Sequence, residues 1–252
     1  MPTLIDQAIV LRHWEFSETS QTVALLARAH GRLKGIAKGA RRENAKFGGG
    51  FELLTRGELV AIVKPGVELA TLTEWDLQEI FWPARRDLLA HHAGMYLVDL
   101  AHHAIVDQDP HPGLFDALLR ALRRLGEADA VRDAVLRFQW DLLTEVGLRP
   151  RLGAPQDRQK GGVYLFDPRA GGIGGASAPP APGGAPVWRV RESTVDLLRV
   201  LESPDPAFPT TPAHRQAVAR ATRLLAEFLK IALDREPPSQ APFLALVTGA
   251  NG

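Results

Sequence analysis

The run E-L-V-A-I-V-K at residues 58–64 is followed by Pro65-Gly66 and then by E-L-A-T-L-T-E-W-D-L at residues 68–77. Pro-Gly is a strong turn signal, and the second run alternates between two sets of side chains, which is the period of a strand. This stretch therefore predicts two neighbouring strands joined by a tight turn.

Three further strand-like runs precede this pair and are separated by turn-forming residues. They cover residues 7–14, 21–29 and 32–37. Five short strands in so short a segment favour a small barrel, and an OB-fold is the most economical barrel of this size. An SH3-like barrel stays open as an alternative, and residues 21–29 also fit the period of a helical turn.

The apolar spacing changes to a helical period after residue 84. It predicts helices over residues 84–106, 114–125, 131–146 and 218–229. Residues 170–186 are almost only Gly, Ala, Ser and Pro, with little side-chain area to bury, so we expect them to be mobile. The predicted class is α+β, with an OB-fold domain at 1–80, a helical domain at 81–150, a small irregular lobe containing this loop at 151–190, and C-terminal helices that complete the helical domain at 191–252.

Positive charge gathers between Arg28 and Phe47, although the formal net charge of the chain is only +1. This segment holds seven cations against one acid, Glu43, and its glycines recur at every fourth residue. Glycine lets the backbone approach a phosphate closely, so the pattern favours a nucleic-acid contact over a merely solvated hairpin. The candidate phosphate contacts are Arg12, Arg32, Lys34, Lys38, Arg41, Arg42 and Lys46.

Aromatic residues accompany these cations. Trp14 and Phe47 are candidates for stacking on bases, as in single-strand binding proteins, with packing in the core as an equally open alternative. A second group of cations lies in the helical region. Such arginines most often cover a solvated surface, but they also suit docking of an acidic peptide. The candidates for this docking are Arg120, Arg123, Arg124 and Arg132.

The sequence lacks the motifs of several chemistries. It has neither G-x-x-x-x-G-K-[ST] nor G-x-G-x-x-G and no nucleophile–base motif, so we expect no enzyme activity and no cofactor. It has no cysteine, hence no thiolate metal site. The pairs His91-His92 and His102-His103 would lie about 16 Å apart on a helix, too far to share an ion. Without a bilayer-spanning run or a signal peptide, we expect a cytoplasmic protein.

Three N-terminal stretches resemble the bacterial RecO recombination mediator family. They are A-I-V-L-R-H-W-E-F-S-E-T-S-Q-T-V-A-L-L at 8–26, H-G-R-L-K-G-I-A-K-G-A-R-R at 30–42 and K-F-G-G-G-F-E-L-L at 46–54. Within them, A-K-G-A-R-R is the most family-specific run. The stretch F-Q-W-D-L-L-T-E-V-G-L-R-P-R-L at 138–152 is similar to the helical region of that family.

The resemblance implies an OB-fold followed by a helical domain, in a nucleoid-associated protein that acts without catalysis. It implies binding of single- and double-stranded DNA, annealing of complementary strands and a complex with a RecR-type ring. That complex would help to load a recombinase onto strands coated by single-stranded DNA-binding protein. The basic residues of 32–46 would match the DNA-contacting face of the family.

The chain departs from the family in one respect. Many members carry a four-cysteine zinc finger after a G-x-x-P-x-L segment, whereas no cysteine stands around Pro155 and Arg158 or near Gly175 and Ala178. We therefore expect a degenerate, metal-free lobe that either keeps a hairpin around Val163 to Phe166 or is partly disordered. Two other functions stay open on the residues alone: an RNA-binding OB-fold protein, and a protein–protein scaffold with an incidental basic loop.

Overall fold

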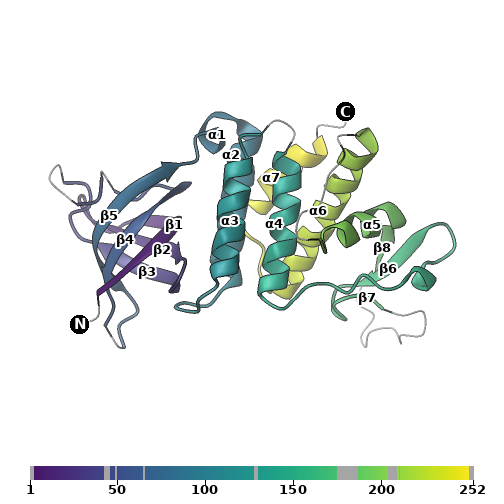
Figure 1. Ribbon diagram of the computed structural model, residues 1–252, viewed down its shortest axis with the longest axis horizontal. Coiled ribbons are helices and arrows are strands. Elements are labelled where there is room, and N and C mark those ends of the chain that lie inside the picture. Colours follow the sequence, from purple (N-terminus) through teal and green to yellow (C-terminus); the bar gives the residue numbers. More distant parts are fainter. Residues whose placement is uncertain are drawn as a thin grey trace. The chain divides into compact units, whose positions relative to one another are not determined.

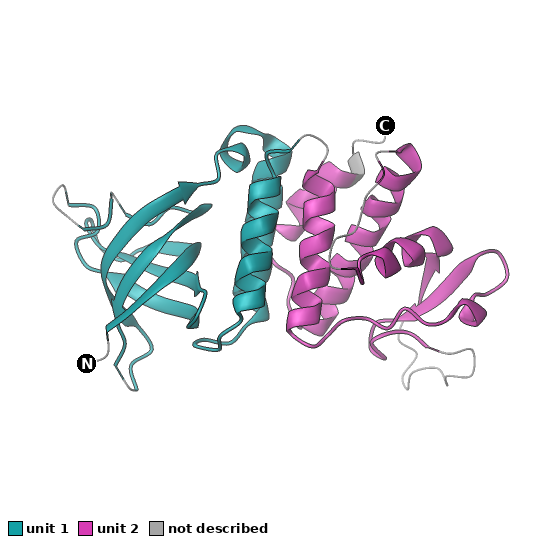
Figure 2. Cartoon of the chain, in the orientation of Figure 1, with its two compact units in different colours: residues 1–127 teal, residues 128–252 magenta. Residues whose placement is uncertain are grey.

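The structure, a computed structural model, describes residues 3–42, 46–48, 50–64, 66–127, 130–174, 187–203, 209 and 211–249. The chain divides into two compact units, Met1–Glu127 and Ala128–Gly252 (Figure 2). The finer predicted division, with boundaries at residues 80, 150 and 190, stays a prediction. Most of the predicted mobile loop, residues 175–186, lies outside the described residues.

The first unit begins with a closed five-stranded barrel of order β1-β2-β3-β5-β4 (Figure 1). All neighbouring pairs are antiparallel except β3 and β5, which run parallel. The predicted OB-fold is confirmed, and residues 21–27 form a strand, so the helical alternative for that run is wrong. The strands are β1 (Thr3–Glu15), β2 (Gln21–Ala27), β3 (Gly31–Ala37), β4 (Thr55–Ile62) and β5 (Ala70–Ile80).

Alternation along the strands fills the barrel with apolar side chains. Val10, Leu25 and Leu59 point inward, and Phe51 and Trp75 pack together with ring centroids 4.9 Å apart. Each such side chain contributes about 1.5–3 kcal/mol when it is fully buried. This core fixes the strand register, because a slip of one residue would expose every one of these side chains.

Three helices follow the barrel in the first unit. They are α1 (Pro83–Arg86), α2 (Leu88–Ala104) and α3 (Pro112–Arg124). Asp87 caps α2 by accepting a hydrogen bond of 2.8 Å from the backbone N–H of Ala90. The helix α2 packs against β1 and β2, so it covers part of the outer face of the barrel.

Among its described residues, the second unit has four α-helices and a small three-stranded sheet of order β7-β6-β8. The helices are α4 (Val131–Glu145), α5 (Glu192–Val200), α6 (Pro212–Ala232) and α7 (Gln240–Gly249), and the strands are β6 (Val163–Asp167), β7 (Gly172–Ile173) and β8 (Trp188–Arg191). The predicted hairpin around Val163 to Phe166 is present as β6 and β7. Within the predicted mobile loop, Gly172 and Ile173 are buried and paired with β6, so mobility is the wrong expectation for them.

Candidate nucleic-acid interface

The outward face of β1, β2 and β3 carries two rows of neighbouring side chains, set by the strand register. Trp14 is 46% exposed at the end of the second row. An exposed aromatic on this part of an OB-fold is placed where such folds bind oligonucleotides. The first row is Arg12, Ala24 and Lys34, and the second row is Trp14, Thr22 and Ile36.

The chain after β3 lies against the loop between β1 and β2. The backbone N–H of Gly39 donates to Ser20 Oγ over 3.1 Å, and that of Arg41 donates to the Thr19 carbonyl over 3.1 Å. The same loop begins with Phe16, which is 63% exposed. These hydrogen bonds from the backbone of Gly39 and Arg41 hold the basic segment beside two exposed aromatic rings. Cations next to aromatic rings are the combination that proteins use to bind single strands.

The cations of the basic segment differ in how far they are neutralised. Arg41 pairs with Glu15 at 2.6 Å, and Lys46 pairs with Glu74 at 2.5 Å, both at the surface. Lys38 and Arg42 are exposed and have no acidic partner among the described residues. Surface pairs contribute little, about 0–1 kcal/mol, so Arg41 and Lys46 can exchange a carboxylate for a phosphate, while the other two cations can bind one directly.

Two of the predicted phosphate contacts, Arg32 and Lys34, already pair with one carboxylate in the structure. Arg32 Nε and Lys34 Nζ reach the two carboxylate oxygens of Asp107, at 2.5 Å and 2.8 Å. Burial raises the pKa of Asp107, but hydrogen bonds from Lys34 and Arg32 outweigh it and lower this pKa overall. Arg32 also donates to the carbonyl of His102 and is mostly buried. Arg32 therefore holds the loop after α2 against β3, while Lys34 is exposed enough to reach a ligand.

Arg12 is likewise held by α2. Its guanidinium donates to Asp99 over 2.7 Å and lies 3.4 Å from His103 Nε2. Burial and the neighbouring cations Arg12 and Arg32 lower the pKa of His102 to about 4. His102 is therefore neutral at physiological pH, and the positive charge of this face comes from its arginines and lysines.

Phe47 does not lie on this face. It is only 5% exposed and belongs to the barrel core, with its ring 5.8 Å from that of Phe51. Of the two alternatives for Phe47, the structure supports core packing, which leaves Trp14 as the candidate for stacking. Thr22 and Ile36 were not among the predicted site residues. The strand register places them beside Trp14, which faces outward because of a bulge between Val10 and Arg12 that the sequence pattern does not show.

Two of the three regularly spaced glycines serve packing. A Cβ at Gly31 would lie 2.0 Å from the Asp109 carbonyl oxygen, and one at Gly35 would lie 2.5 Å from Leu72 Cδ2. Gly39 differs, because it has a φ of +67° and its nearest neighbour is the flexible side chain of Arg42. The interpretation of all three glycines as phosphate-approach residues is therefore wrong for Gly31 and Gly35.

The predicted docking arginines are distributed over both units. Arg123 donates two hydrogen bonds to Glu79, at 2.9 Å and 2.8 Å, and lowers the pKa of that carboxyl. Arg124 pairs with Glu127 at 3.3 Å. Arg120 lies on α3 with them, whereas Arg132 lies on α4 in the second unit. An acidic peptide would have to displace Glu79 or Glu127, so this docking stays a prediction.

The described residues contain no group of three or more His, Asp or Glu side chains placed to hold a metal ion. No helix in the described part of the chain is long and apolar enough to cross a membrane. The histidine pairs form edge-to-face ring contacts, 5.7 Å apart for His91 and His92 and 4.9 Å for His102 and His103.

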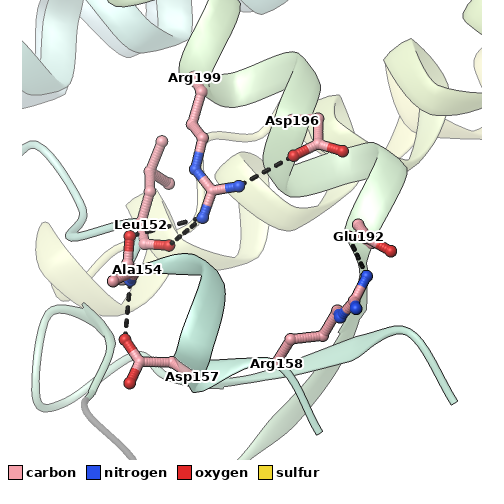
Figure 3. A network of polar contacts seen from close by, with 8 residues as sticks. Leu152, Ala154, Asp157, Arg158, Glu192, Asp196 and Arg199 are labelled. Carbon is pink, nitrogen blue, oxygen red and sulfur yellow. Dashed lines mark hydrogen bonds and ion pairs between the residues drawn. The ribbon is translucent and has the colours of Figure 1, made fainter. Parts of the chain in front are cut away.

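One arginine, Arg199, connects separate parts of the cysteine-free lobe (Figure 3). Arg199 on α5 donates to the carbonyls of Leu152 and Gly153, each at 3.4 Å, and pairs with Asp196 at 2.9 Å. Its guanidinium also lies 5.4 Å from the ring centre of Tyr164 on β6. One side chain thus links the chain entering the lobe, the sheet and α5.

Replacing Arg199 with methionine is expected to lower the free energy of unfolding of the second unit by about 2 kcal/mol, because it leaves the part-buried carbonyl of Leu152 without this donor and removes the contact with the Tyr164 ring. Amide hydrogen exchange around Leu152 and Tyr164 should accelerate. Arg158→Met is the matched control, since it breaks only an exposed pair with Glu192 and should cost less than about 1 kcal/mol. Equal losses in both variants would contradict a linking role for Arg199. A melting temperature of the unaltered protein that falls when EDTA is added would show that a metal ion holds the lobe instead.

Comparisons with known proteins agree with this architecture. The family model described as "Recombination protein O N terminal" matches residues 1–81, and "Recombination protein O C terminal" matches residues 85–241. A protein of Anaeromyxobacter dehalogenans named "DNA repair protein RecO" is 30% identical over 90% of this chain and 90% of its own length. A protein of the same name from Rhodopirellula baltica is 40% identical over 57% of this chain, and that match spans 53% of its own length. A third, from Myxococcus xanthus, is 33% identical over 66% of this chain and 69% of its own length. The chain therefore belongs to the RecO family of DNA repair proteins.

Proposed function

We propose that the protein is a non-enzymatic recombination mediator that binds single- and double-stranded DNA and anneals complementary strands. One observation carries the proposal: the exposed ring of Trp14 lies on the outward face of the barrel, and the basic residues of 38–42 are held by hydrogen bonds against the loop that follows it. Membership of a DNA repair family supports DNA over RNA as the ligand.

The mechanism rests on charge neutralisation. Five cations would hold phosphates, and the rings of Trp14 and Phe16 would stack on bases or sugars of a flexible strand. Two strands repel each other less once their phosphates are neutralised, so their bases can meet and pair. Arg12 and Arg32 would contribute positive potential and keep the strand face in place through Asp99 and Asp107. The five phosphate-binding cations are Lys34, Lys38, Arg41, Arg42 and Lys46.

The proposed setting is the bacterial cytoplasm, at the nucleoid, without a cofactor. The partners would be a RecR-type ring protein and single-stranded DNA-binding protein, and the complex would load a recombinase onto coated strands. The arginines of α3 would be the first surface to test for an acidic segment of such a partner. Family membership supports these partners, and direct binding measurements with the purified proteins would test them.

A salt titration tests DNA binding by this face. Five contacts to single-stranded phosphates should give a slope of about −3.5 in a plot of log affinity against log salt concentration. The affinity should therefore fall about a hundredfold over a fourfold rise in salt. A slope near zero would contradict the proposal. An annealing assay in which DNA and RNA strands compete should favour DNA, and a preference for RNA would favour the RNA-binding alternative.

A further inference from the structure

The small sheet of the second unit carries exposed arginines on one face. In β8 the side chains alternate, so that Val190 is buried while Arg189 and Arg191 are exposed. The register sets Arg189 opposite Leu165 and Arg191 opposite Val163 on β6. The two arginines and the two apolar side chains therefore share the outer face of the sheet.

The positive charge of this face is not neutralised by the acids close to it in sequence. Glu192 pairs with Arg158 at 2.5 Å, and Asp196 pairs with Arg199 at 2.9 Å (Figure 3). Within the described residues, the side chains of Arg189 and Arg191 have neither a hydrogen bond nor an ion pair. Residues 175–186, which lead to β8, contain no acid in their sequence. The face therefore has a surplus of cations.

A third arginine extends the charge. Arg220 of α6 donates to Thr194 Oγ1 over 3.3 Å and to Ser193 Oγ over 3.2 Å, at the start of α5. Both partners are neutral hydroxyls, so the guanidinium keeps its full charge. Burial and the charge of Arg191 lower the pKa of Arg220, as expected where like charges lie close together without a counter-ion.

Apolar surface lies between the cations. Leu165 is 44% exposed opposite Arg189, although a polar residue is usual on the solvent face of a small sheet. Guanidinium groups bind phosphates with two parallel hydrogen bonds, and exposed apolar side chains can contact sugars and bases. An acidic protein surface would satisfy the charges, but the demonstrated DNA repair family favours a phosphate chain.

We propose that the outer face of the small sheet, centred on Arg189 and Arg191, binds phosphates of single-stranded DNA as a second surface, separate from the barrel. This inference rests on the proposed DNA-binding function and extends it, because two surfaces on one chain can engage two strands or two segments of one strand.

The test compares salt slopes on a long single-stranded oligonucleotide. Arg189→Ala/Arg191→Ala removes two contacts and should make the slope less negative by about 1.4, at about 0.7 for each single-strand phosphate. Arg189→Lys/Arg191→Lys keeps both charges and should keep the slope of the unaltered protein. Arg149→Ala/Arg169→Ala removes two exposed cations from loops of the same unit and should also leave the slope unchanged.

The outcomes separate the two proposals. A slope near zero for the unaltered protein would overturn DNA binding altogether. A steep slope that Arg189→Ala/Arg191→Ala does not change would overturn only the second surface, and so would an equal change in the loop control. Thermal unfolding of every variant checks that the lobe is folded. If the alanine variant is unstable, Arg189→Gln/Arg191→Gln, which also removes both charges, should give the same change in slope.

Discussion

Replacing Lys38 and Arg42 with alanine is expected to lower the affinity for single-stranded DNA about a hundredfold at low salt. Both side chains are exposed and have no acidic partner among the described residues, so neither must give up a carboxylate before it binds a phosphate. A charged hydrogen bond contributes about 1.5 kcal/mol or more, and two of them amount to about a hundredfold. Fluorescence anisotropy with a labelled oligonucleotide would measure the loss, and the salt slope should become less negative by about 1.4.

The matched control is Arg85→Ala/Arg86→Ala. These two cations lie on α1 of the same unit and are exposed, so the control removes the same charge from another place. Its affinity should stay within about threefold of the unaltered protein, as expected for a change in long-range potential alone. If both variants lose affinity equally, the barrel face is not the contact. If neither loses affinity while both remain folded, the scaffold hypothesis is favoured.

Strand periodicity and turn residues predicted the barrel because they act locally. The alternation through Trp75 indicates β5, and the Pro-Gly pair in the sequence indicates the turn that precedes it. The outward exposure of Trp14 does not follow from alternation, because a bulge between Val10 and Arg12 reverses which face the later residues of β1 occupy. The helix over residues 84–106 was predicted as one element, whereas the structure has α1 and α2 with a break at Asp87, which caps the second helix. The sequence predicts C-terminal helices after residue 191 but bounds for only one of them. It does not delimit α5, which is short, or α7, whose mostly apolar residues give no helical stripe.

Long-range contacts explain what the pattern could not predict. Asp107 is distant in sequence from Arg32 and Lys34, so their pairing depends on the path of the chain after α2. Phe47 follows a cation in the sequence, yet the chain between β3 and β4 carries its ring into the core. Composition alone does not show which cations are paired with a carboxylate. In the structure Arg12 and Arg32 are paired with Asp99 and Asp107, whereas Lys38 and Arg42 have no acidic partner among the described residues.

Gly31→Ala is expected to lower the free energy of unfolding of the first unit by about 4 kcal/mol, which is exceptional for a single substitution. Gly31 has a φ of +69°, which costs about 1–2 kcal/mol for any residue with a Cβ. The added Cβ would also lie 2.0 Å from the carbonyl oxygen of Asp109, which is backbone and cannot rotate away. The loop would have to leave β3, and with it the hydrogen bond of 2.9 Å from the Gln108 N–H to the Arg32 carbonyl. Urea unfolding followed by hydrogen exchange of the amides of the barrel strands would measure the loss in the first unit.

Gly66→Ala separates the two causes of this loss. Gly66 has a φ of +73° in the same unit, but nothing lies within 4 Å of the position of an added Cβ. It therefore carries the backbone strain alone and should cost about 1–2 kcal/mol. The difference between the two variants measures the close approach of the loop to β3. Because Asp107 in that loop binds Arg32 and Lys34, Gly31→Ala should also weaken DNA binding in protein that is still folded, whereas Gly66→Ala should not. Equal destabilisation by the two substitutions would mean that the loop moves freely, and it could not then hold the strand face in position.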